Sequence, residues 1–259
     1  MAATRTDGKK RNRVLVVALV LVAVLVAAFA ASELYLRRQV QSCMASQFES
    51  QLGSKVDVGL SWKPVLLQSI DKRVPYVTLE SNDTSFGPAV GMDVQARVDD
   101  VHIEETPDSN GTIGSSTAEV RWSTAGILAT MHQQPFGTLI GNVVSDPAAG
   151  TLTFSVGPGG LADLEVRPHI SGDTIAVETV GAEILGFGLP TDLVDGVVQT
   201  LTESLQTYPL DMVPTSVEVT GDAIEISLEG GAYTMPAADP SDPAVQEQRD
   251  QLEGCGFLV

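Results

Sequence analysis

Ser69 and Lys72 stand three residues apart, the spacing at which a lysine can activate a serine hydroxyl for acyl transfer. That chemistry also needs a second motif of the Lys-Thr-Gly type. The lysines beyond residue 10 are Lys55, Lys63 and Lys72, and none of them is followed by Thr-Gly. A chance match to a short pattern therefore explains this pair better than catalysis does.

The histidines and the clustered carboxylates are the other candidates for chemistry. None of His102, His132 and His169 has another histidine or a cysteine three or four residues away, so the sequence lacks the His and Cys spacing of a zinc site. The acidic stretch 99–108 lacks the alternating ligands and the central glycine of a calcium-binding loop. We therefore predict no catalytic residue, no metal ligand and no cofactor, and expect a protein that is not an enzyme.

Two cysteines remain as reactive groups, Cys43 and Cys255. In an oxidising compartment a disulfide between them is the expected state, because two free thiols are a liability there. The bridge would close a loop of about 212 residues, which on the chain-entropy model contributes at most roughly 5 kcal/mol. Two unpaired cysteines, acting as small apolar side chains, are the alternative.

The compartment follows from residues 14–31, an unbroken apolar run preceded by five basic residues. As a helix this run would be about 27 Å long, close to the ~30 Å hydrocarbon core of a bilayer. Since basic residues favour the cytoplasmic side, we predict a cytoplasmic tail at 1–13 and a single membrane anchor at 14–31. A secretory signal is the alternative, because Ala28 and Ala30 offer a small-x-small cleavage site. Both interpretations place residues 32–259 outside the cytoplasm.

The exported part, 32–259, is strongly acidic and has the length of one domain. It contains ten Lys and Arg against thirty-two Asp and Glu, a net charge of −22. Such a surface repels nucleic acid and anionic headgroups, so we expect no nucleic-acid partner. Any approach to the membrane is expected to use the tether and apolar contacts rather than a polybasic patch.

The hydrophobic periodicity predicts an α+β protein. Apolar residues three and four apart predict a helix at 32–52, and strict alternation predicts a strand at 56–62. Further helices are expected at 125–132 and at 191–207, where one face is apolar. Strands are expected at 74–81, 90–105, 117–123, 151–156, 163–170, 174–184, 216–220 and 223–229.

The apolar faces of these elements are the candidate lining of a ligand cavity. Core packing is the simpler interpretation of any single stripe, because core and lining positions follow the same period. The candidate lining residues are Val40, Met44, Phe48, Val58, Leu60, Trp62, Leu128, Met131, Phe136, Leu185, Phe187, Val194, Val198 and Leu201.

The order of features along the chain carries a family resemblance. A basic tail, an apolar anchor and a helix with one cysteine precede the strand 56–62 and the segment 74–81 (VPYVTLES); many strands, a late helix and a terminal cysteine follow. In this order the chain resembles the LmeA-like phospholipid-binding proteins of actinobacteria. The resemblance covers essentially all of residues 32–259 and rests on the overall pattern rather than on a short signature.

The resemblance implies a fold and a function. The fold would be a strongly curved antiparallel sheet wrapped around one long helix, as in tubular lipid-binding domains. The function would be phospholipid binding at the cytoplasmic membrane, with lipids of the phosphatidylinositol type, in support of envelope lipid or lipoglycan assembly. A structural protein that docks envelope enzymes and has no ligand cavity is the alternative. The sequence makes no prediction of the oligomeric state.

Overall fold

The computed structural model describes residues 7–52, 55–86, 89–104, 106–184, 187–206, 208–237 and 246. The helices are α1 (Asp7–Leu52), α2 (Val65–Asp71), α3 (Thr124–His132) and α4 (Thr191–Leu205), with 3-10 turns η1 (Gly137–Leu139) and η2 (Pro209–Asp211). The strands are β1 (Val56–Leu60), β2 (Arg73–Phe86), β3 (Ala89–Ile103), β4 (Ser109–Ile113), β5 (Ser115–Ser123), β6 (Ile140–Asp146), β7 (Thr151–Val156), β8 (Ala162–Ser171), β9 (Thr174–Ile184), β10 (Phe187–Gly188), β11 (Val213–Val219), β12 (Ala223–Gly230) and β13 (Tyr233–Pro236).

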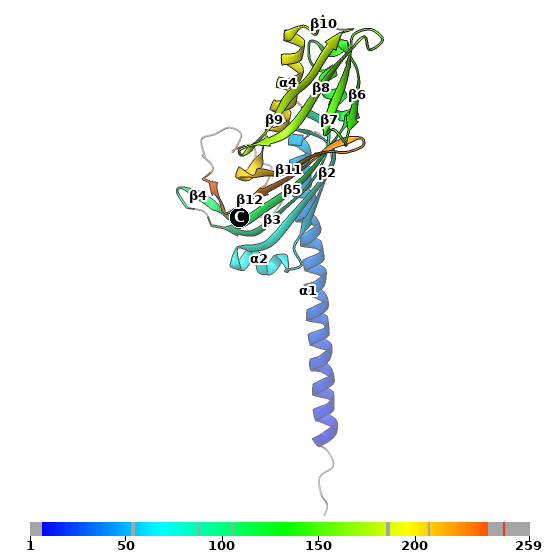
Figure 1. The fold of residues 1–259 in the computed structure, drawn as a ribbon. Helices are drawn as coiled ribbons and strands as arrows, with labels where there is room; N and C mark the ends of the chain where they lie inside the picture. The colour runs from blue at the N-terminus through cyan, green and yellow to red at the C-terminus, as the bar shows by residue number, and fades with distance from the viewer. Residues whose placement is uncertain are drawn as a thin grey trace, which may run out of the picture.

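Helix α1 joins the predicted anchor and the predicted helix after it into one continuous element of 46 residues, about 69 Å long. Its lower part stands clear of the rest of the protein, and its upper end lies against the strands (Figure 1). The segment Val16–Ser46 is long and apolar enough to cross a membrane, and its most apolar window is not buried by the protein. The large apolar side chains from Val16 to Phe29 are exposed, and lipid rather than water would stabilise such a surface.

The strands form two antiparallel sheets. The larger sheet has eight strands in the order β1-β2-β3-β5-β12-β11, with β4 pairing with both β3 and β13 at one side. The smaller sheet has five strands in the order β10-β9-β8-β7-β6. The smaller sheet lies beyond the larger one, on the side away from the free part of α1 (Figure 1).

One hydrophobic core joins the two sheets. Trp122 of β5, Ile127 of α3 and Phe154 of β7 are completely buried within it. Helix α4 contributes residues four apart, among them Val197 and Leu201, which is the spacing that puts side chains on one helical face. The core therefore holds α3 and α4 in place between strands that are far apart in sequence.

The α+β class, the long apolar helix and the antiparallel strands are confirmed. The arrangement differs from the expected one, because the strands are divided between two sheets. Among the described residues, two helices pack against strands in different places: α1 packs beside β1, and α4 packs beside β9. Wrapping of one curved sheet around one long helix stays a prediction from the resemblance.

Candidate functional site

An apolar pocket of about 570 Å³ lies against the inner face of the larger sheet. Its volume falls within the ~300–1,000 Å³ of typical small-molecule sites. The described residues that line it come from α1, β1 to β5, the end of α4, η2 and the last strands: Met44, Val58, Val77, Leu79, Ser81, Met92, Val94, Ala96, Val98, Val101, Ile113, Ala118, Val120, Ser204, Leu205, Tyr208, Pro209, Leu210, Met212, Ile226, Leu228 and Met235. No Asp, Glu, Lys, Arg or His is among them.

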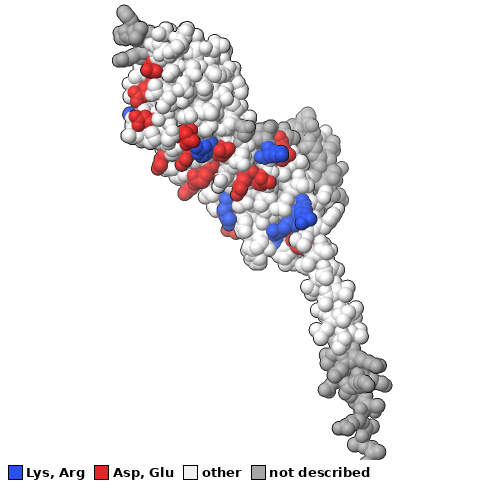
Figure 2. Space-filling view, turned by 90° about the vertical axis from the view of Figure 1, so that its right-hand side faces the viewer, with Lys and Arg blue, Asp and Glu red and all other residues white. Residues whose placement is uncertain are grey.

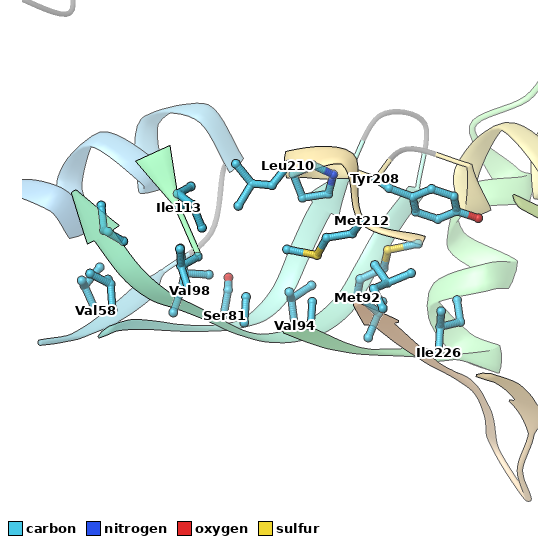
Figure 3. A pocket seen from close by; sticks show the side chains of 18 of the residues that line it. Val58, Ser81, Met92, Val94, Val98, Ile113, Tyr208, Leu210, Met212 and Ile226 are labelled. Atoms are coloured by element: carbon cyan, nitrogen blue, oxygen red, sulfur yellow. The ribbon is translucent and has the colours of Figure 1, made fainter. Parts of the chain in front are cut away.

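The floor of the pocket follows from the alternation of side chains along β3. Met92, Val94, Ala96 and Val98 are two residues apart and all face the pocket. Side chains of a strand point alternately to its two faces, so the residues between them face the other way. Gln95 is accordingly exposed. Figure 3 shows Met92, Val94 and Val98 standing in one row on the sheet.

Pairing between strands extends this floor across the sheet. Ala96 lies opposite Leu79 of β2 and opposite Ala118 of β5. Leu79 lies in turn opposite Val58, and Ala118 opposite Leu228. Directly opposed residues share a face, so this row runs across five strands on the pocket side. The two alanines at its centre leave room that larger side chains would fill.

The serine hydroxyls of the lining are already hydrogen-bonded within the protein. Ser81 Oγ donates to the backbone carbonyl of Lys55 at 3.1 Å. Ser204 Oγ donates to the carbonyl of Thr200 one helical turn earlier, at 2.7 Å. Since both hydroxyl groups already donate within the protein, the lining presents a mainly apolar surface to the pocket.

Tyr208 contributes its ring to one end of the pocket, with the hydroxyl directed away from it (Figure 3). The backbone N–H of Ile175, in β9 of the smaller sheet, donates to this hydroxyl at 3.0 Å. Burial raises the pKa of Tyr208, and the hydrogen bond from Ile175 opposes that rise. The tyrosine thus ties the pocket to the smaller sheet through its polar end.

The short turn η2 lies over the pocket opposite the sheet. Leu210 points its side chain toward the pocket (Figure 3) and has a φ of 58°. The next residue, Asp211, has a φ of 52°. Left-handed backbone is uncommon for residues other than glycine, so two such residues in sequence store local strain. Met212 directly after them is buried in the core, which holds the strained turn in position.

Helix α1 closes the side of the pocket at the edge strand β1. Gln41 Nε2 donates to the carbonyl of Val58 at 2.9 Å, and the Arg37 guanidinium donates to the carbonyl of Ser61. Glu49 accepts a hydrogen bond from the N–H of Val56 at 3.3 Å. The free backbone N–H and C=O groups of an edge strand can pair with another chain. Here side chains of α1 form hydrogen bonds to such groups. Met44 on the same helix lines the pocket.

The structure brings two of the predicted lining residues, Met44 and Val58, to this pocket. Val40 and Leu60 are half-buried on α1 and β1 but are not among the lining residues. Trp62 lies elsewhere, with 77% of its surface exposed. The alternation predicted a strand through residue 62, but β1 ends at Leu60 and the chain bends toward α2, which turns the indole into solvent.

The predicted residues of α3, α4 and the segment between them lie in the core or against it. Met131 and Leu201 are buried core residues. Leu128, Phe136, Val194 and Val198 are partly buried and pack against that core. An apolar face that packs on a sheet has the same period as one that lines a cavity, so the pattern did not distinguish them. Leu185 and the side chains of Phe48 and Phe187 lie outside the described residues.

Sequence reasoning missed the main part of the lining, which comes from β2, β3, β5 and β12. The signal was present in the long alternation of β3, where the small residue Ala96 stands among larger apolar ones. Ala118 occupies the equivalent place in β5. Small residues at the centre of an inward-facing row indicate a hollow only once the strand order is known.

The pocket and its surroundings define a class of protein: an antiparallel α+β protein with an apolar pocket beside a long apolar helix. The chain belongs to the LmeA-like phospholipid-binding family, whose model matches residues 27–229. The resemblance noted from the order of features is thereby confirmed.

The chain is also similar to uncharacterized proteins of Mycobacterium bovis and of two strains of Mycobacterium tuberculosis. Each is 28% identical over 231 residues, which cover 86% of this chain and 66% of the relative. This chain therefore spans slightly less than two thirds of the length of these relatives. No solved structure matches it.

Proposed function

We propose that the protein is a membrane-anchored carrier that shelters phospholipid acyl chains in the pocket of the larger sheet. The observation that supports this most directly is the pocket itself, which is lined almost wholly by apolar side chains. Membership of a phospholipid-binding family supports the same class of ligand. The carrier needs no catalytic group, since its task is to keep apolar surface from water.

The energetics of an acyl chain explain why such a pocket is required. Moving a 16-carbon chain from a bilayer into water costs on the order of 12 kcal/mol, at about 0.8 kcal/mol per methylene. A pocket without charged lining recovers much of this by replacing water around the chain. A phosphate would be poorly solvated there, because an unpaired buried charge is costly. In this proposal the headgroup therefore stays at the mouth, in contact with solvent.

The proposed location follows from α1. Residues 14–31 form the single span, the basic residues before it stay in the cytoplasm, and the acidic domain lies in the periplasm or cell-wall space. There the carrier would supply phospholipid, including lipids of the phosphatidylinositol type, to the assembly of envelope lipids or lipoglycans. A docking protein without a cavity is the less suitable account, because the pocket would then have no role.

Lipid analysis of the purified protein tests this proposal. The full chain is extracted from its own membranes in mild detergent, and native mass spectrometry then identifies bound molecules. We expect phospholipid in defined stoichiometry, retained after washes that remove loosely bound lipid. A protein that carries no lipid, and takes up none from vesicles, would contradict the proposal.

A further inference from the structure

Helix α2 forms the lower face of the folded part, on the side from which the free length of α1 extends (Figure 1). It runs across the direction of α1 rather than along it (Figure 1). Glu33 of α1 joins the two helices: its carboxylate accepts hydrogen bonds from the N–H of Val65 at 2.6 Å and of Leu66 at 3.3 Å. These are the first two residues of α2, whose free N–H groups need such an acceptor.

This contact sets the height of α2 relative to the proposed membrane span. Glu33 comes two residues after the apolar run 14–31, which is about 3 Å along a helix. The headgroup region of a bilayer extends roughly 5–8 Å beyond the hydrocarbon core on each side. The first turn of α2 therefore lies at the depth of the headgroups when α1 spans the membrane.

The outer side of this region exposes large apolar side chains. Trp62, just before α2, is 77% exposed, and Ile70 in its last turn is 79% exposed. Leu67, one turn before Ile70, is 47% exposed. Val65 and Gln68 of the same helix are buried, so α2 has an inner and an outer side. Tryptophan at the boundary of a bilayer is the typical interfacial anchor.

The charge of this end also differs from that of the remaining domain. Residues 32–73 contain six Lys and Arg against four Asp and Glu, whereas residues 74–259 contain four against twenty-eight. Lys72 and Arg73, directly after α2, are exposed. On the face in Figure 2, acidic side chains extend from the upper end to the middle, and basic ones gather near the place where α1 leaves the domain. An anionic leaflet would attract this end and repel the other.

We propose that Trp62, Leu67 and Ile70, with Lys72 and Arg73 beside them, form a foot that docks in the headgroup region of an anionic bilayer. The occupant of this surface is the outer leaflet of the membrane that α1 is proposed to span. The proposal rests on the anchor of the proposed function and adds a second membrane contact to it. The sequence led us to expect a membrane approach by the tether and apolar contacts rather than by a polybasic patch. The foot uses such apolar contacts and adds the two basic residues beside them.

The foot has a consequence for lipid entry. Met44, which lines the pocket, is eleven residues beyond Glu33 on α1, or ~16.5 Å along the helix axis. With the foot in the headgroups, this side of the pocket is held within about one acyl-chain length of the leaflet. A domain tethered by α1 alone would be free to tilt away from the surface.

Tryptophan fluorescence of the full chain in vesicles tests the foot. The described residues include Trp62, which is exposed, and Trp122, which is completely buried in the core. The protein is reconstituted into phosphatidylcholine and phosphatidylglycerol in equal parts, with a nitroxide placed near the top of some acyl chains. We expect strong quenching that falls several-fold in Trp62→Phe, since Trp122 lies away from the lipid.

Two matched variants separate the foot from a general membrane effect. In Trp62→Phe combined with Leu161→Trp the new indole lies in the exposed turn between β7 and β8 of the smaller sheet, and we expect no recovery of quenching. Ile70→Glu should reduce the quenching of Trp62, whereas Leu161→Glu should not. Absence of quenching at Trp62, or equal quenching at residue 161, would overturn the foot. Lipid found in the purified protein would show that the pocket proposal survives that result.

Discussion

At the scale of single residues, the pocket depends on small side chains at the centre of its floor. Ala96 and Ala118 lie opposite each other on β3 and β5, and both face the pocket. Their small size, rather than any polar group, leaves the space that we propose an acyl chain fills. The volume of these two side chains therefore sets the size of the pocket. Replacing one of them by a larger apolar residue tests whether that space is needed for binding.

Ala96→Phe is expected to fill the middle of the pocket and to weaken the binding of phospholipid by at least about tenfold, or ~1.4 kcal/mol. The matched control is Gln95→Phe, which places the same ring on the exposed face of the same strand. Binding is measured as the fraction of protein that carries lipid in native mass spectra. Equal loading of the two variants would show that the lipid binds elsewhere.

Tyr208→Phe removes the acceptor for the buried N–H of Ile175 and is expected to lower the free energy of unfolding by about 1–3 kcal/mol. Urea unfolding at neutral pH measures this change. The exchange rate of the Ile175 amide should rise in the same variant. An unchanged midpoint with unchanged exchange would mean that the hydroxyl does not hold the two sheets together.

The same tyrosine predicts a dependence on alkaline pH. Burial raises the pKa of Tyr208 in the folded state, so the unfolded chain releases this proton at lower pH than the folded one does. Stability is therefore expected to fall as the pH rises past about 10, the usual value for tyrosine. Unfolding experiments across this range should show a smaller fall in Tyr208→Phe. Identical slopes for both proteins would contradict this assignment.

At the scale of elements, α1 is both the proposed anchor and a wall of the binding domain. Its residues 33, 37 and 41 are four apart and make hydrogen bonds to the start of α2 and to the edge of the larger sheet. A helix that only tethered the domain would not need this ladder. The spacing keeps the three side chains on one helical face, which fixes the rotation of α1 relative to the pocket.

Glu33→Ala is expected to loosen α2, because two N–H groups at its first turn lose their acceptor. Loss of a helix cap typically costs about 0.5–2 kcal/mol. Hydrogen exchange in the amides of 65–71 should become faster, while exchange in β7 and β8 should stay the same. Glu33→Gln retains an acceptor oxygen and should restore part of the protection. Unchanged exchange in Glu33→Ala would show that α2 is held by its buried face alone.

Sequence reasoning predicted the elements better than their assembly. The helix expected at 191–207 appears as α4 (Thr191–Leu205), and the strand expected at 151–156 has the same bounds as β7. Strands β4, β6, β10 and β13 were missed. For β4 and β13 the reason is that these short strands are defined by pairing between segments about 120 residues apart. The pocket was missed for the same reason, since its floor exists only after β3, β5 and β12 have been placed side by side.

Trp62 shows how one broken element changes a residue's role. Alternation placed it on the face of Val58, but the chain leaves the strand before reaching it. Periodicity alone could not indicate this end, because Pro64 comes only two residues later and a strand can run up to a proline. The residue expected to line the cavity is instead 77% exposed and belongs to the proposed foot.

At the scale of the whole molecule, the two ends of the exported chain are predicted to be joined. Cys43 is half-buried on α1, and Cys255 lies outside the described residues, so the bridge stays a prediction. It would connect the C-terminus to the helix that lines the pocket. Non-reducing peptide mapping of protein from its native membrane should yield one linked peptide pair containing both cysteines.

Removal of either cysteine is expected to lower the free energy of unfolding by up to roughly 5 kcal/mol, the chain-entropy figure for a loop of this size. Cys43→Ser, Cys255→Ser and the double variant should lose the same amount, because each breaks the same bond. Additive losses in the double variant would indicate two separate packing effects. Alkylation of both thiols without prior reduction would exclude the bridge.

The central claim is that an acyl chain lies in the pocket of the larger sheet, and photo-crosslinking tests it most directly. The full chain in vesicles is exposed to a phospholipid that carries a diazirine near the end of one acyl chain, and labelled peptides are mapped after irradiation. We expect labels on β2, β3 and β12, at pocket residues such as Leu79, Val94 and Ile226, and their loss in Ala96→Phe but not in Gln95→Phe. Labels confined to residues 14–31 of α1 in all three proteins would contradict the account.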